Sequence, residues 1–381
     1  MHPILKPALR RAWRDLQTVQ FGVAPAHAKV LGPVDMATSS FLHLLDGTRG
    51  LPLLREEGRR AGLPQGHVDH LVGRLSEAGL VDDATGGGPE AEALRECGKT
   101  MDRLRPDLAS LSLLSTAPGE AMGRLAARRR LRVQVRGAGR VGAMIASLLA
   151  GAGIGRIEMM DGGCVEPWDV APGGLPADSV GLRRVDAARR MLTRAAPGRP
   201  PRGAFRSPAE TPAAAGYALV VFAPRDGLEA YAPAPANAES LLAPRTPHLY
   251  AGVLEGTGMV GPLVLPGVNG CAGCLSLGRA EKDPAWPRML AQWRSGRARQ
   301  APACDLTVAA AVAGLAASHA LAFLDGRLPA SAGSRWEAAL PAGAWRSWPV
   351  APHTQCVCGA TDGGKREEPP GSREPQDTMA L

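Results

Sequence analysis

A glycine-rich turn near the middle of the chain constrains the fold more than any other feature. The short apolar strand RVQVR, residues 132–136, is followed by Gly137, Gly139 and Gly142 at the spacing G-x-G-x-x-G. The first glycine permits a tight turn, the second lets the backbone approach a phosphate, and the third lets a helix pack closely on the strand. A second strand, RIEMMD, ends at Asp161, where a carboxylate can accept hydrogen bonds from ribose hydroxyls. The pattern predicts a Rossmann-like fold with a nucleotide-shaped pocket.

Strands and helices alternate from this turn to about residue 360. The helix that begins at Arg140 is followed by the strand RIEMMD, a helix around SVGLRRVDAARRMLTRAAP and the strand YALVVFAP. This order predicts an α/β domain over residues 129–360, with a mostly parallel sheet covered by helices on both faces. Residues 361–381 are polar and rich in glycine and proline, so we expect a disordered tail there.

Residues 1–85 are predicted to form a separate, small α+β domain. TVQFGV and AKVLGPV are typical of two strands, and three short helical stretches follow, the third with apolar residues three and four apart. Together with a final LVDD they indicate a winged-helix-like unit, joined to the rest by a linker and helix over residues 86–128. Such a unit can bind DNA through its last helix, or bind a peptide as an extra strand at its sheet edge. The outward positions of the third helix include a single arginine, Arg74, which disfavours DNA.

Charge and hydropathy limit the classes of function and the location. The net charge of +8 comes almost entirely from arginine in a chain rich in alanine, glycine and proline, a bias typical of a GC-rich genome, so we expect no nucleic-acid partner. The first residues lack the apolar core and cleavage site of a secretory signal. The apolar run over residues 306–324 is mostly alanine and contains Ser318 and His319. We therefore expect a buried helix rather than a membrane span, and a cytoplasmic protein.

Four of the seven cysteines form two close pairs. Cys271 and Cys274 form C-x-x-C after a glycine turn, and Cys356 and Cys358 form C-x-C much later in the chain. Disulfides are disfavoured in a reducing cytoplasm, and four thiolates from two such turns can surround zinc tetrahedrally. We predict a structural zinc site, with His353 as an alternative to one of the sulfur ligands.

Longer blocks around these motifs point to a family. GAGRVGAMIASLLAGAGIGRIEMMDGGCVEPWDV, SVGLRRVDAARRMLTRAAP, GPLVLPGVNGCAGCL and ACDLTVAAAVAGLAASHALAFLDG follow one another in the chain. Over residues 130–360 this order resembles the ThiF-type family, whose members are similar to the adenylating domain of ubiquitin-activating enzymes. The resemblance implies a site for ATP and Mg²⁺ in which the C-terminal carboxylate of a small protein or peptide becomes an acyl-adenylate. It also implies a homodimer.

Several positions depart from the pattern on which the family's chemistry depends. Asp161 is kept, but Gly163 stands where the family has a second acid, and Arg184 stands at the lysine position. The segment WDVAPGG occupies the place of an asparagine and an arginine, and Arg225 precedes Asp226 where a magnesium-binding aspartate belongs. Because adenylyl transfer depends on positioned charges, the loss of several such groups predicts a degenerate ATP site.

Three functions remain open from the sequence. A winged-helix-like module before a ThiF-type domain resembles the partner proteins of azoline-forming cyclodehydratases, which implies a scaffold that binds the leader of a ribosomal precursor peptide and presents it to a partner cyclodehydratase. The alternative is an active adenylyltransferase that uses Asp161, Arg184 and Asp226, with Cys304 as acyl acceptor. The resemblance places Cys304 where the family often has a thioester- or disulfide-forming cysteine; the other interpretation is a buried cysteine at a helix start, which would lower its pKa in either case. A DNA-binding regulator is the third.

Overall fold

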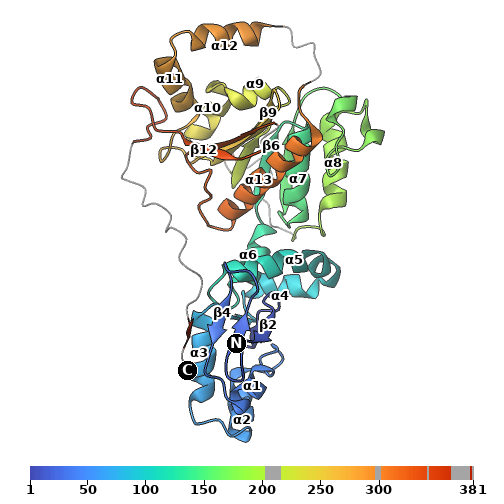
Figure 1. Ribbon diagram of the computed structural model, residues 1–381. Helices are drawn as coiled ribbons and strands as arrows, with labels where there is room; N and C mark the ends of the chain where they lie inside the picture. The colour runs from blue at the N-terminus through green and yellow to red at the C-terminus, as the bar shows by residue number, and fades with distance from the viewer. Residues whose placement is uncertain (202–215, 297–301, 341–342, 362–377, 380–381) are drawn as a thin grey trace. The chain divides into compact units, whose positions relative to one another are not determined.

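The computed structural model divides the chain into two compact units, which we describe separately (Figure 1). It describes residues 1–201, 216–296, 302–340, 343–361 and 378–379. The first unit comprises residues 1–127 with residues 366–381, and the second comprises residues 128–365. A disordered tail was expected over residues 361–381. Residues 362–377 and 380–381 of this segment lie outside the described residues.

The first unit begins with short strands and three helices. One antiparallel sheet contains β2 (Arg11–Trp13), β3 (Val19–Phe21) and β4 (Lys29–Leu31), and a two-stranded ribbon pairs β1 (Pro3–Leu5) with β5 (Val81–Asp83). The helices are α1 (Met36–Leu42), α2 (Leu51–Arg60) and α3 (His67–Glu77). Val19 and Leu31 of the sheet are fully buried with Phe41, Leu71 and Leu75 of the helices. The two strands and three helices expected from the sequence are present, and β3 pairs with β4.

Two further features complete the first unit. The helices α4 (Pro89–Glu96), α5 (Gly98–Leu114) and α6 (Glu120–Arg128) enclose a small core of their own around Leu104 and Leu125. The outer edge of β4 pairs in parallel with β13 (Thr378–Met379), with Thr378 opposite Val30. The edge of this sheet therefore accepts an added strand.

The second unit is built on a seven-stranded sheet of order β12-β11-β10-β9-β8-β6-β7. Its strands are β6 (Arg132–Arg136), β7 (Arg156–Met160), β8 (Leu219–Phe222), β9 (His248–Leu254), β10 (Thr257–Val264), β11 (Ser334–Ala339) and β12 (Arg346–Pro349). The run β7-β6-β8-β9 is parallel, which confirms the predicted α/β fold, and β9 to β12 are antiparallel. This antiparallel half was not predicted from the sequence, although Glu255 and Gly256, both with positive φ, make the tight turn between β9 and β10.

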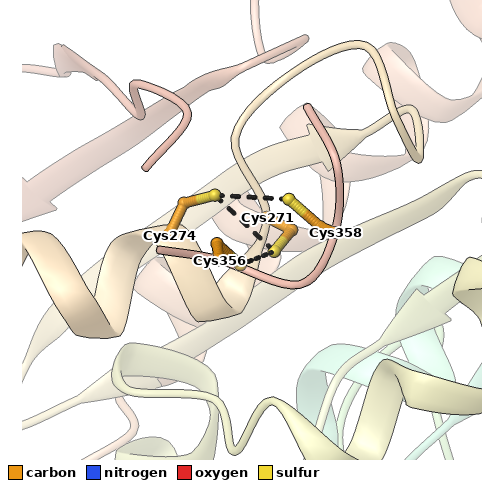
Figure 2. Close-up of side chains that lie close together, drawn as sticks. All are labelled: Cys271, Cys274, Cys356 and Cys358. Atoms are coloured by element: carbon orange, nitrogen blue, oxygen red, sulfur yellow. Dashed lines mark hydrogen bonds between the residues drawn. The ribbon is translucent and has the colours of Figure 1, made fainter. Parts of the chain in front are cut away.

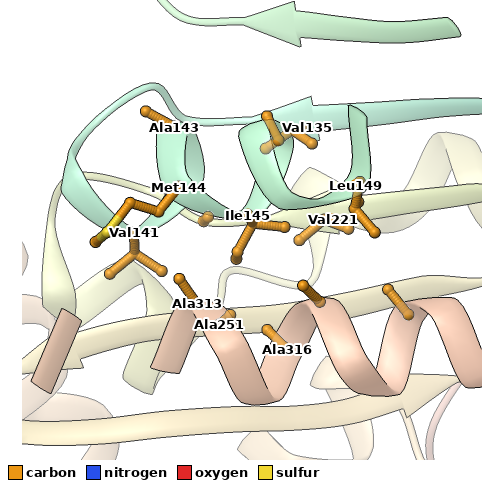
Figure 3. Close-up of a cluster of buried hydrophobic side chains, with 14 of the residues drawn as sticks. Val135, Val141, Ala143, Met144, Ile145, Leu149, Val221, Ala251, Ala313 and Ala316 are labelled. Carbon is orange, nitrogen blue, oxygen red and sulfur yellow. The ribbon is translucent and has the colours of Figure 1, made fainter. Parts of the chain in front are cut away.

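Two layers of helices cover the sheet (Figure 1). Alternate residues of the parallel strands pack against one layer or the other. The first layer contains α7 (Arg140–Gly151), α8 (Arg184–Ala195) and α13 (Leu306–Leu324), and the second contains α9 (Gly227–Tyr231), α10 (Ala236–Leu242), α11 (Ala272–Lys282) and α12 (Trp286–Ser295). Val135 and Val221 of the sheet pack with Ile145 of α7 and Ala316 of α13, as Figure 3 shows.

Helix α13 is long and apolar enough to cross a membrane by length and composition alone. Its alanine-rich face is buried, however, and packs against α7, β9 and β10. The small side chains allow the close approach of the helix to the sheet: an added Cβ at Gly258 of β10 would lie 2.7 Å from Val312 of α13. The expected role as a core helix fits this packing.

His248 in β9 gives the second unit a defined pH dependence. The side chain is fully buried, its Nδ1 donates to the carbonyl oxygen of Thr246 at 3.1 Å, and burial lowers its pKa to about 4. The unfolded chain, whose histidine titrates near 6.5, binds more protons, so stability falls as the pH drops from 6.5 to 4. We expect the protonation of His248 to lower the free energy of unfolding by about 3 kcal/mol between pH 7 and pH 4. In urea titrations, His248→Gln should lack this part of the pH dependence; an unchanged dependence would contradict the assignment.

Candidate functional site

The glycine turn connects the carboxyl end of β6 to α7, where the order of the parallel strands reverses. Ligands of open α/β sheets bind at such a point. Gly137 has a φ of +112°, and an added Cβ there would lie 1.9 Å from the carbonyl oxygen of Ala223. A Cβ at Gly142 would lie 2.1 Å from the carbonyl oxygen of Gly137. The backbone itself therefore requires the first and third glycines of the motif.

The second glycine of the motif faces a side chain of the same chain. An added Cβ at Gly139 would lie 2.8 Å from Cγ of Arg225, so the stem of that arginine covers the surface that this glycine exposes. Nearby, the Ala138 backbone N donates to Oδ2 of Asp161 at 2.6 Å. One amide of the loop thus donates its hydrogen bond to a carboxylate of the protein. Arg225 lies over the position at which the sequence predicted a phosphate.

Two arginines and three acids form an ion network beside the loop. Arg184, 5% exposed, donates through Nε to Asp169 and through Nη2 to Glu166, both at 2.9 Å, and its Nη1 lies 3.4 Å from Asp161. Arg225 donates through Nε to Asp169 at 2.8 Å and through Nη2 to Glu166. Burial lowers the pKa of Arg225, but its bonds to Asp169 and Glu166 outweigh burial and hold that pKa above its usual value. Such paired, hydrogen-bonded charges are stable only as a set.

The positions predicted to depart from the family pattern contribute to this geometry. Gly163 has a φ of +75°, and an added Cβ there would lie 3.0 Å from Nη1 of Arg184. The guanidinium of Arg184 therefore lies beside the position where the family carries its second acid. Asp226 lies outside the network, where its Oδ1 accepts a hydrogen bond from the Leu228 backbone N at 2.9 Å and caps α9.

A cavity of about 540 Å³ opens at the carboxyl ends of the parallel strands. Asp161, Arg184 and Asp226, which sequence analysis placed in one site, all line it, together with Gly137. On the sheet side the lining is Arg136, Phe222 and Tyr250. Arg136, Tyr250 and Glu166 were not predicted as site residues. Arg136 was assigned only to a strand, and no role was assigned to Tyr250 or to Glu166, although Glu166 is the one acid between Asp161 and Asp169.

Cys304 does not line this cavity. It lines a separate one of about 30 Å³ with Arg140 and Trp168, and its carbonyl oxygen accepts a hydrogen bond from Nη1 of Arg140 at 2.8 Å. Burial raises the pKa of the Cys304 thiol, and the nearby Asp305 raises it further, although Arg140 acts in the opposite direction. The expectation of a lowered pKa at this helix start was therefore wrong, because desolvation raises it, and the thiol is protonated at neutral pH.

Four cysteines gather at the start of α11, as Figure 2 shows. Cys271 and Cys274 come from the turn before α11 and from its first turn, and Cys356 and Cys358 from the segment after β12. All four sulfur atoms lie within 4.8 Å of one another, and the sulfur atoms that share a hydrogen bond are 3.5 to 3.8 Å apart. A tetrahedral centre with metal–sulfur bonds near 2.3 Å separates its sulfurs by about 3.8 Å. The cluster has the dimensions to hold a metal ion.

The thiols of the cluster differ in their surroundings. Burial raises the pKa of the Cys271 thiol and raises that of Cys358 to about 11, whereas hydrogen bonds to Cys274 outweigh its burial and lower its pKa. His353, the alternative ligand, lies outside the sulfur cluster: its Nε2 is 2.9 Å from Glu281, and its backbone N donates to Sγ of Cys274 at 3.3 Å. His353 therefore donates a hydrogen bond to Cys274, a candidate metal ligand, and does not take the place of a cysteine ligand.

The model of the ThiF family matches residues 119–359. The chain belongs to the ThiF family. The matched region includes the glycine turn, the ion network, Cys304 and all four clustered cysteines. No curated protein matches the sequence.

Solved structures show the same fold over nearly the whole chain. MccB of E. coli, solved with succinimide, has a TM-score of 0.66 at 15% identity, and the alignment covers 94% of this chain and 99% of that one. The microcin C7 biosynthetic enzyme MccB, solved with N-formylated MccA, has a TM-score of 0.65 at 16% identity, covering 94% and 100%. PaaA has a TM-score of 0.63 at 17% identity, covering 91% and 99%. The N-terminal unit of this ThiF-family protein therefore also has counterparts in these structures.

Proposed function

We propose that this ThiF-family protein is a cytoplasmic scaffold that binds the leader of a ribosomal precursor peptide and presents it to a partner cyclodehydratase, without consuming ATP at its own glycine loop. The observation that carries the proposal is the ion network in which Arg225 covers Gly139 and shares Glu166 and Asp169 with Arg184. The charges and hydrogen-bonding groups of these side chains are paired with one another at the place where an adenylating enzyme would hold phosphates and a metal ion.

The acids of the site are a poor set for Mg²⁺. Magnesium demands oxygen ligands in near-octahedral geometry, usually one or two carboxylates with phosphates and water. Here Asp169 accepts from two arginines, Asp161 accepts from the Ala138 backbone N, and Asp226 caps α9. A magnesium ion would have to displace arginines from Asp161 and Asp169, so the acids of the network do not fit Mg²⁺-ATP.

The N-terminal unit supplies the peptide-binding part of the proposal. Strand addition at a sheet edge uses main-chain hydrogen bonds for affinity. The outer edge of β4 already pairs with Thr378–Met379 of the same chain, which supports β4 as an acceptor of an extended segment. The similar MccB structure is solved with N-formylated MccA, and by analogy we assign a precursor peptide to this protein.

We assign the cysteine cluster to structural zinc. Four thiolates in a closed tetrahedron leave no open coordination position, which is typical of structural rather than catalytic sites. The ion would hold the start of α11 to the segment that contains Cys356 and Cys358. It would stabilise the second unit and take no part in chemistry.

Hydrogen exchange tests the peptide-binding site directly. Synthetic peptides encoded by short reading frames beside the gene are added to the full-length protein, and amide exchange is followed by mass spectrometry. We expect one peptide to protect the backbone at residues 29–31, because an added strand covers the edge of β4, and a scrambled peptide of equal composition to give no protection. Deletion of residues 362–381 should strengthen binding, since it removes the strand that pairs with β4. Protection confined to residues 137–142 would contradict the proposal.

A second function, an active adenylyltransferase, draws support from the retained loop and from Asp161 in the lining of the cavity. It would use Asp161, Arg184 and Asp226 in altered geometry, with Cys304 as acyl acceptor. In that case Asp161→Ala must abolish ATP-dependent activation of a peptide carboxylate. A homodimer is compatible with either function, and sedimentation equilibrium measures it.

A further inference from the structure

The clustered sulfur atoms form two pairs, each of which joins the start of α11 to the segment after β12 (Figure 2). Sγ of Cys271 lies 3.6 Å from Sγ of Cys356, and Sγ of Cys274 lies 3.5 Å from Sγ of Cys358. Both distances are shorter than the 3.8 Å between Cys271 and Cys274. Each cysteine at the start of α11 therefore has a partner of its own in the segment after β12.

Neighbouring backbone holds both pairs in place. An added Cβ at Gly273 would lie 2.8 Å from Sγ of Cys356 and 3.4 Å from Sγ of Cys271. A side chain at this position would therefore push the sulfur of Cys356 away from its partner. In the other pair, the His353 backbone N donates to Sγ of Cys274 at 3.3 Å, which keeps that sulfur turned toward the segment after β12.

The two members of each pair differ in exposure. Cys271 and Cys274 are 5% and 2% exposed. Cys356 and Cys358 are partly exposed, and Val357 between them is 94% exposed. A small oxidant in solvent can therefore reach one sulfur of each pair, while the other sulfur lies beside it in the interior. An accessible thiol next to a second thiol that can resolve it is typical of cysteines that respond to oxidants.

We propose that the cluster is an oxidation site at which hydrogen peroxide joins each cysteine at the start of α11 to its partner in the segment after β12. The two disulfides are Cys271–Cys356 and Cys274–Cys358, and they take the place of the metal ion. The metal belongs to the proposed function, whereas the choice of partners depends only on the sulfur positions. A disulfide joins sulfurs at about 2 Å, so each pair has to close by about 1.5 Å, which a change in side-chain torsions provides.

The chemistry of each pair balances with one molecule of hydrogen peroxide. The partly exposed thiol attacks the peroxide: the O–O bond breaks, the sulfur keeps one oxygen as sulfenic acid, and one water leaves. The buried thiol then attacks the sulfenic sulfur, the S–S bond forms, and the oxygen leaves as a second water. The two sulfurs lose two electrons to the peroxide, and the two thiol protons end in the waters. For zinc-bound thiolates these two protons come from solvent, and Zn²⁺ is released as its ligands are lost.

Oxidation exchanges one link between the two segments for another. The partners are 85 and 84 positions apart in the chain, and cross-links that close such long loops restrict the unfolded chain. The oxidised protein should therefore melt at least about 5 °C above the reduced protein from which a chelator has removed zinc. An oxidised protein no more stable than the chelated one would show that the disulfides do not replace the metal as a link.

Peroxide treatment of the full-length, zinc-loaded protein tests the proposal. Remaining thiols are blocked with iodoacetamide, disulfides are assigned by mass spectrometry after stepwise partial reduction, and released zinc is measured with a chromophoric chelator. We expect both cross pairs, loss of the bound zinc, and recovery of the four thiols with dithiothreitol. A disulfide between Cys271 and Cys274 in place of the cross pairs would overturn the proposal, and so would sulfinic acids without cross-links.

The same mapping on reduced, metal-free protein decides the pairing if the purified protein holds no zinc. In that case the zinc assignment fails, and the disulfide assignment stands or falls on the mass spectra alone. Leader binding at β4 involves neither result.

Paired substitutions assign the partners. Cys271→Ser with Cys356→Ser keeps one proposed pair, whereas Cys271→Ser with Cys358→Ser keeps two cysteines that are not partners. In the metal-free proteins we expect the first double variant to form its disulfide at least about tenfold faster than the second. Equal rates would overturn the assignment. Mapping in the parent protein needs no variant, so it decides the question if a double variant does not fold.

Discussion

Replacing Cys274 with serine is expected to abolish binding of the proposed zinc ion and to lower the melting temperature of the second unit by about 10 °C. The sulfur of Cys274 lies within 4.8 Å of three other cysteine sulfurs, and the side chain is 2% exposed. Loss of one thiolate from a closed site breaks the tetrahedron, and three sulfurs, one buried and two partly buried, then remain without a cation. A cost of about 3 to 4 kcal/mol corresponds to this shift in a domain of roughly 240 residues.

Two other cysteines provide matched controls for this substitution. Cys97 and Cys164 are exposed and lie outside the cluster, so Cys97→Ser and Cys164→Ser should keep both the metal and the melting temperature. Elemental analysis of the purified protein gives the metal content, and differential scanning fluorimetry gives the melting temperature. A parent protein that contains no zinc, or a Cys274→Ser variant as stable as the parent, would exclude a structural zinc site.

Asp169→Asn is expected to destabilise the second unit by about 3 to 5 kcal/mol. Asp169 is 2% exposed and accepts hydrogen bonds from Nε of Arg184 and Nε of Arg225. Asparagine keeps the shape but removes the charge that compensates both guanidinium groups, and it places an amide N–H₂ against one of them. Removing one member of a buried ionic set leaves charge without compensation, which costs far more than the loss of a surface pair.

Asp186→Asn is the control for Asp169→Asn. Asp186 forms an exposed ion pair with Arg189 in the same helix, and such pairs contribute about 0.3 to 0.5 kcal/mol. Urea unfolding of both variants at pH 7 measures the difference. If Asp169→Asn and Asp186→Asn lower the free energy of unfolding by equally small amounts, the residues of the network do not compensate one another's charges as the proposed function requires.

Much of the architecture could be predicted from local patterns. The glycine spacing, the strand before it and the acid after the next strand are all local, and they lead to β6, α7 and β7 with the expected turn. The apolar positions of residues 67–77 likewise fixed α3. The antiparallel half of the sheet was missed because β10 is buried on both faces and shows no alternation, and because its pairing with β11 spans a long sequence distance.

The residues of the site could be predicted from the sequence better than the contacts between them. Gly139 and Arg225 were both singled out, but only the fold shows that the stem of one covers the other. Arg184 was assigned to a lysine position, and its partners Glu166 and Asp169 lie in a loop whose path no local pattern determines. Arg136 was missed because its place in the lining of the cavity depends on the fold and not on residue type.

The central claim is that the glycine loop of this ThiF-family protein no longer serves ATP chemistry, and ATP–pyrophosphate exchange tests it most directly. The full-length protein is incubated with ATP, Mg²⁺, labelled pyrophosphate and the peptide that protects β4 in the exchange experiment. We predict no incorporation of label into ATP above a protein-free blank, and the same result for Asp161→Ala. Robust exchange that depends on the peptide and is lost in Asp161→Ala would contradict the account and establish an adenylyltransferase.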